Sequence, residues 1–112
     1  MHMTTPLPGK KVRGSETGRP IMALLDLVGR RWSLRVLWEL RAEPCTFRVL
    51  QSRCDNLSPT VLNTRLHELR EAGIIEHGDE GYRLSEQGRS LIAAFLPLHD
   101  WAERWAASMT EQ

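Results

Sequence analysis

The segment NLSPTVLNTRLHELREAGII, residues 56–75, gathers hydrogen-bonding side chains on one side of a predicted helix. At about 100° per residue, Leu62, Leu66 and Leu69 share one face, which is typical of a helix packed on a core. The rest of the surface carries polar side chains that are mostly uncharged: Thr60, Asn63, Thr64 and His67. Such groups can bond the edges of nucleic acid bases, or they can form an ordinary solvated helix face.

The sequence contains no motif that is typical of a metal site or of a catalytic nucleophile. The two cysteines, Cys45 and Cys54, are eight residues apart, and no histidine stands at ligand spacing from either. There is no nucleophile elbow, no glycine-rich phosphate loop and no metal-binding triad. We therefore expect a protein that is not an enzyme and has no cofactor and no bound metal. The sequence leaves open whether Cys45 or Cys54 is redox-active.

Charge is unevenly distributed along the 112 residues. Residues 1–53 hold ten Lys or Arg against four Asp or Glu, whereas residues 54–112 hold five against ten. Such asymmetry indicates either a half that faces a polyanion or an ordinary mixed-charge surface. The first 20 residues lack the apolar segment of a secretory signal, and no run of eighteen apolar residues exists, so we expect a cytoplasmic protein without a membrane span.

The elements before the opening segment are predicted from their breakers and caps. Residues 1–18 have little apolar content and three basic residues, so we expect a flexible basic arm. A helix follows over 20–29, then a second helix that we expect Pro44 to stop. A short third helix begins at about Phe47, with Thr46 as its N-cap.

The opening segment itself predicts a helix over about 58–72, with Ser58 as N-cap and Gly73 as a left-handed end. A β-hairpin is expected over 74–77 and 82–84 around the turn GDEG, and a short strand near Cys45 could pair with it. Ser85 caps a long final helix that Pro97 should kink or split.

This order of elements makes a winged helix-turn-helix, mainly α with a small β-hairpin and a long C-terminal helix. One domain is expected over 19–108, with a tail over 109–112.

Three motifs resemble the HxlR family of bacterial winged-helix transcription regulators. They are LDLVGRRWSLRVLWEL, FRVLQSRCDNLSPTVLNTRLHELREAGII and YRLSEQGRSL, followed by a helix that bears tryptophan. The resemblance runs from about Pro20 to Trp105. It implies a dimer that binds operator DNA and regulates nearby genes. Many members carry a cysteine where this chain has Arg19, so the resemblance gives no support for redox sensing there.

In a helix-turn-helix, the N-terminal residues of the second helix enter the major groove first. We therefore predict base contacts from Thr60, Asn63, Thr64 and His67. Phosphates are expected at the start of this helix, where the backbone amides are free, and at flanking arginines. The predicted phosphate contacts are Ser58, Arg48, Arg65 and Arg83.

The last helix carries an aromatic stripe longer than a small wing domain can cover, which favours self-association. The resemblance implies dimerisation through the first and last helices. The predicted dimer interface is Leu24, Leu25, Phe95, Leu98, Trp101 and Trp105. The two recognition helices of a two-fold dimer would contact successive major grooves of double-stranded DNA. The operator is therefore expected to be palindromic.

The alternative is a winged-helix module that binds protein rather than DNA. The hairpin tip is acidic, with Asp79 and Glu80 between two glycines, and would be repelled by phosphates. The residues do not identify the operator, distinguish repression from activation, or show whether a small-molecule or redox effector acts on the protein.

Overall fold

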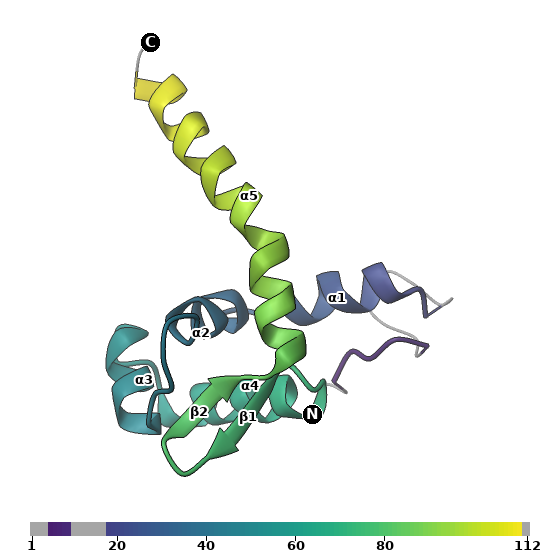
Figure 1. The fold of residues 1–112 in the computed structure, drawn as a ribbon, viewed down its shortest axis with the longest axis vertical. Helices are drawn as coiled ribbons and strands as arrows, with labels where there is room; N and C mark the ends of the chain where they lie inside the picture. The colour runs from purple at the N-terminus through teal and green to yellow at the C-terminus, as the bar shows by residue number, and fades with distance from the viewer. Residues whose placement is uncertain (1–4, 10–17, 111–112) are drawn as a thin grey trace.

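The computed structural model describes residues 5–9 and 18–110, which form five helices and a hairpin (Figure 1). The helices that precede the hairpin are α1 (Pro20–Val28), α2 (Ser33–Glu39), α3 (Phe47–Arg53) and α4 (Pro59–Glu71). The hairpin is β1 (Ile75–Gly78) and β2 (Gly81–Leu84), and α5 (Glu86–Thr110) follows it. The order confirms the predicted winged helix-turn-helix with a long C-terminal helix.

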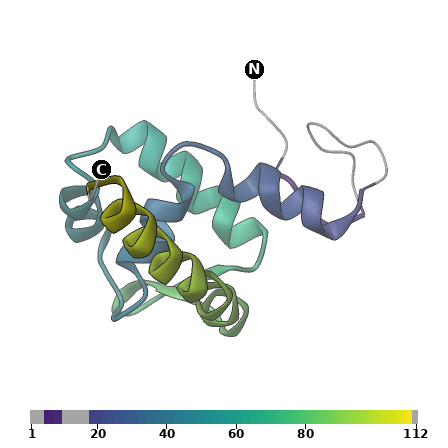
Figure 2. The same cartoon turned by 90° about the horizontal axis from the view of Figure 1, so that it is seen from above.

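The core lies around α2, which packs against α1, α3, α4 and α5. Val36 and Leu37 of α2 are fully buried, as are Leu50 of α3 and Leu62 and Leu69 of α4. Seen from above, α1 leads away from this bundle on the side opposite α3 (Figure 2). The periodic leucines predicted to pack α4 on the core therefore do so.

Local capping follows the sequence closely. The amide of Val49 donates to Thr46 Oγ1 at 3.2 Å, and the amide of Gly88 donates to Ser85 Oγ at 3.0 Å. Gly73 has φ of 76°, as expected of the residue after α4. Ser58 is the N-cap residue of α4, but its side chain makes no capping hydrogen bond. The tight turn between α3 and α4 uses Asp55 and Asn56 at positive φ, which these residue types tolerate.

The hairpin pairs Ile75 with Leu84 and Gly78 with Gly81, so its loop is only Asp79–Glu80. Each strand thus extends one residue further toward the tip than predicted. Cys45 pairs with Tyr82 in a single antiparallel bridge, with backbone hydrogen bonds of 2.8 and 2.9 Å. The predicted strand near Cys45 is therefore reduced to this bridge.

The ends and the continuity of two helices differ from the predictions in three ways. Helix α2 ends at Glu39, before Pro44 can stop it. Helix α5 runs unbroken past Pro97, so the predicted split does not occur. Pro97 and Ala93 are both exposed, so water can hydrogen-bond the carbonyl that the proline leaves without an amide. Because α5 reaches Thr110, the predicted tail loses its first two residues to the helix.

Part of the predicted flexible arm is packed. Thr5 and Pro6 are buried, and Pro6 and Pro8 lie over α1 and the end of α4 around a small cavity that Leu24 also lines. Lys10, Lys11 and Arg13 lie outside the described residues.

Gly88, in the first turn of α5, is expected to tolerate no side chain. A Cβ there would lie 2.1 Å from the carbonyl oxygen of Ile74 and 3.2 Å from Cβ of Leu84. Gly88→Ala should lower the free energy of unfolding by about 1–3 kcal/mol, although alanine favours helices. Urea denaturation measures this loss. Ser90→Ala, at an exposed position two residues further along α5, should change stability by no more than about 0.5 kcal/mol.

Candidate nucleic-acid interface

Helix α4 presents the predicted base-reading side chains together on its exposed face. Leu62, Leu66 and Leu69 are at most 1% exposed on the opposite face. The four side chains on the outer face are all exposed: Thr60, Asn63, Thr64 and His67. The structure therefore brings these residues together on one accessible surface, which we call the α4 outer face.

The hydrogen-bonding capacity of this face is largely free. In the part of the chain that the structure describes, the side chain of Asn63 has no hydrogen-bond partner. The hydroxyl of Thr64 donates to the Thr60 carbonyl at 2.9 Å, which leaves the hydroxyl oxygen free to accept a hydrogen bond. His67 Nε2 lies 3.3 Å from Glu71 Oε2, and Thr5 Oγ1 donates to the same oxygen at 3.0 Å.

A hollow of about 290 Å³ separates the α4 outer face from β2. It is lined by Asn63, Thr64, Leu66, His67, Arg70 and Tyr82. Arg70 was not among the predicted site residues. The spacing of Thr60, Asn63, His67 and Arg70, at i, i+3, i+7 and i+10, was the available signal, because such positions align along a helix.

The predicted phosphate contacts differ in how free they are. Ser58 and Arg48 are exposed, at the start of α4 and on α3. Arg83 Nη2 donates to Glu76 Oε2 across the hairpin at 2.9 Å, in an exposed pair. Arg65 is turned inward: its Nη1 donates to Glu68 Oε1 at 2.7 Å, and its Nε donates to the Arg31 carbonyl at 2.8 Å. Arg65 is thus committed within the chain, whereas Ser58 and Arg48 are accessible.

A model of the HxlR-like helix-turn-helix family matches residues 27–110, which is most of the chain. The chain belongs to this family. The HTH-type transcriptional regulator Rv3095 of Mycobacterium tuberculosis is 33% identical over 95 residues, covering 79% of this chain and 60% of that protein. YdzF of Bacillus subtilis, also named an HTH-type transcriptional regulator, is 30% identical over 94 residues, covering 77% and 83%.

The fold of the HxlR-like chain is also found in a solved transcriptional regulator, YodB. The crystal structure of quinone-bound YodB from B. subtilis superposes with a TM-score of 0.70 at 28% identity, covering 75% of this chain and 96% of YodB. The match with Rv3095 leaves about two-fifths of that relative uncovered, so the two proteins are alike in this domain rather than over their whole lengths.

Among the described residues, the C-terminal half of α5 in this HxlR-like domain is largely uncovered, apart from Trp38 of α2, whose ring stacks on His99 at 5.5 Å. Every residue from Leu96 to Thr110 is exposed, and Figure 1 shows this half projecting from the body. Leu98, Trp101 and Trp105 are 57%, 53% and 55% exposed, and the two indoles stack at 5.7 Å. Phe95 is partly buried beside an apolar groove of about 350 Å³ between α2 and α5.

The two predicted interface residues of α1 face different surroundings. Leu25 is 53% exposed, as an interface residue would be in a single chain. Leu24 is partly covered by the N-terminal segment, because it lines the cavity beneath Pro6 and Pro8.

Both cysteines are buried and free. Burial raises the pKa of the Cys45 thiol, although Arg53 Nη1 donates to its sulfur at 3.3 Å and opposes the rise. Burial likewise raises the pKa of Cys54. Neither thiol is therefore favoured as a thiolate at neutral pH. Over residues 5–9 and 18–110, no group of three His, Cys, Asp or Glu side chains could hold a metal ion, and no helix is long and apolar enough to cross a membrane.

Proposed function

We propose that this chain is a homodimeric, sequence-specific DNA-binding transcriptional regulator that reads the major groove with α4. The observation that carries the proposal is the α4 outer face, where accessible, mostly uncharged hydrogen-bonding side chains stand opposite a buried leucine face. Membership of the HxlR-like helix-turn-helix family and the names of the curated relatives support it. Such a regulator acts in the cytoplasm, where its operator lies.

The chemistry of the α4 outer face suits base edges. Asn63 can bond N6 and N7 of adenine through its free amide, and Thr64 can accept a hydrogen bond or pack its methyl on thymine. Thr60 offers the same groups one turn earlier, and His67 can donate to a guanine acceptor. Glu71 comes last on this face, away from the N-terminal end that enters the groove first.

Phosphates are proposed to lie against Ser58 and the free amides at the start of α4, where the helix dipole favours anions. Arg48 of α3 and Arg83 of β2 flank this position in the proposal. Arg83 would exchange Glu76 for a phosphate at little cost, because an exposed ion pair contributes about 0–1 kcal/mol. Arg65, which the sequence also suggested, would have to leave both of its present partners to reach a phosphate.

Dimerisation is proposed through the exposed half of α5, where Leu98, Trp101 and Trp105 present an apolar surface, together with Phe95, Leu25 and Leu24. A two-fold dimer presents two copies of α4 about 34 Å apart, which matches successive major grooves of a palindromic operator.

The proposal is tested by selecting bound duplexes from a random-sequence library and measuring their affinity by fluorescence anisotropy. We expect an enriched palindromic sequence. A dimer that neutralises roughly six to ten phosphates should lose about 10³- to 10⁵-fold in affinity between 50 and 200 mM salt. If no sequence is enriched and no duplex binds at low salt, the proposal is wrong. The acidic hairpin tip, with Asp79 and Glu80 exposed, would then favour a protein-binding module.

A further inference from the structure

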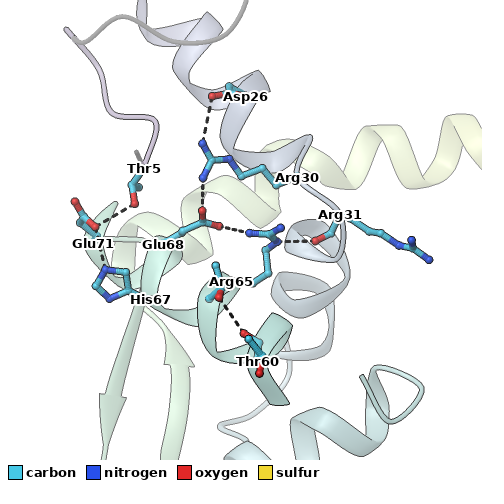
Figure 3. Close-up of polar contacts among 10 residues, drawn as sticks. Thr5, Asp26, Arg30, Arg31, Thr60, Arg65, His67, Glu68 and Glu71 are labelled. Carbon is cyan, nitrogen blue, oxygen red and sulfur yellow. Dashed lines mark hydrogen bonds and ion pairs between the residues drawn. The ribbon is translucent and has the colours of Figure 1, made fainter. Parts of the chain in front are cut away.

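A chain of charged side chains joins α4 to α1 on a side of α4 that faces neither the solvent nor the leucine core. Arg30, in the loop after α1, donates through Nη1 to Glu68 Oε2 and lies 3.6 Å from Asp26 through Nη2. The other oxygen of Glu68 accepts from Arg65 Nη1 at 2.7 Å. Figure 3 shows the four side chains in one continuous line, which we call the α1–α4 charge network.

This network is largely withdrawn from solvent and electrically balanced. Glu68 is 4% exposed, and the side chains of Arg30, Asp26 and Arg65 are 7%, 13% and 19% exposed. Two carboxylates offset two guanidinium groups. Because desolvation opposes the attraction between such charges, a buried network contributes little net stability compared with apolar packing. Its geometry, in contrast, is directional, since each bond requires a particular orientation of donor and acceptor.

The α1–α4 charge network contacts α4 where it can constrain the rotation of this helix about its own axis. The leucine face holds α4 on the core through apolar contacts, and the attraction behind such contacts has no preferred direction. Arg65 and Glu68 bond on another side of the helix, to the Arg31 carbonyl and to Arg30, and these directional bonds add a constraint on the rotation of α4. Arg65 and Glu68 directly follow Thr64 and His67 in the chain, so any rotation of α4 that breaks the network also turns the α4 outer face.

We infer that Glu68, Arg65 and Arg30 are positioning residues that fix the rotation of α4 and thereby aim Asn63 and Thr64 at the bases. This inference rests on the proposed function. Because Asp26 lies in α1, which contributes Leu25 to the proposed dimer surface, the network also connects α4 to the helix that carries this surface.

Glu68→Gln tests the inference because electrostatics and positioning predict opposite results. Removing a negative charge near DNA strengthens binding to every duplex through the phosphates. Loss of positioning weakens binding to the selected duplex alone. We expect the ratio of affinities for the selected and a scrambled duplex to fall about tenfold or more. The slope of log affinity against log salt should stay unchanged, because no phosphate contact is lost.

Glu71→Gln is the matched control. It removes the same charge from the same helix at an exposed position, and the amide oxygen of glutamine can still accept from Thr5 and from His67 Nε2. We expect this variant to keep the ratio. A Glu68→Gln variant that also keeps it would overturn the inference, whereas a wild type that binds no duplex would overturn the proposed function instead.

Arg65→Met provides a second test if Glu68→Gln fails to fold, because it leaves Glu68 paired with Arg30. The inference predicts a lower affinity ratio with an unchanged salt slope. A slope that falls by about two, one for each Arg65 of the dimer, with an unchanged ratio would assign Arg65 to a phosphate and overturn the positioning role. Circular dichroism at the assay temperature confirms that each variant is folded. A merely destabilised variant would lose affinity for both duplexes equally.

Discussion

Replacing Asn63 and Thr64 together with alanine is expected to abolish sequence discrimination while leaving the fold intact. Both side chains are exposed on α4, and alanine has the higher helix propensity, so stability should be unchanged or slightly raised. Each good base contact contributes about 1–3 kcal/mol of discrimination. A dimer loses four such residues at once. Their summed contribution is as large as the difference of about 4–10 kcal/mol between the free energies of specific and non-specific binding.

The affinity for the selected duplex should therefore fall by about 10³-fold or more, close to the affinity for a scrambled duplex, which should hardly change. Fluorescence anisotropy on the two duplexes measures both. Gln87→Ala with Ser90→Ala is the matched control, since it removes two exposed polar side chains from α5. If the double variant keeps the full discrimination of the wild type, Asn63 and Thr64 do not read the sequence.

The register of α4 could be predicted because it depends on short-range pattern. Leucines three and four residues apart determine the buried face, and the residues between them then fall on the outer face. The caps at Thr46 and Ser85 and the turn at Gly73 are equally local, since each requires only the residue type and its neighbours. These features are sufficient to predict that the four proposed base-contacting side chains share one surface.

The long-range contacts could not be predicted in the same way. Arg65 stood at the edge of the core face by its spacing, but its partners are the carbonyl of Arg31, 34 residues away, and a carboxylate shared with Arg30. Thr5 reaches Glu71 across 66 residues from a segment whose composition suggested a free arm. Composition and periodicity describe a segment in isolation, whereas these contacts depend on how α1 and the N-terminal segment pack against α4.

Replacing Trp101 and Trp105 with alanine is expected to dissociate the dimer. Trp101 and Trp105 lie one turn apart on the projecting half of α5, where nothing in the described part of the chain covers them. Tryptophan is enriched among interface residues whose truncation costs about 2 kcal/mol or more, and a dimer loses four indoles. Even with non-additive losses, the dissociation constant should rise by roughly 10³-fold, equivalent to about 4 kcal/mol.

Light scattering at micromolar concentration should report twice the chain mass of 12.8 kDa for the wild type and the single chain mass for the variant. Because Trp101 and Trp105 do not pack on the core, the variant should keep its helical circular dichroism and its affinity for a single half-site. Its affinity for the full palindrome should fall toward that half-site value. The two α4 helices of a dimer bind both half-sites together, whereas each monomer binds its half-site independently. Glu103→Ala, on the opposite side of the same turns of α5, should remain dimeric. A monomeric wild type, or a dimeric double variant, would show that this surface does not hold the dimer together.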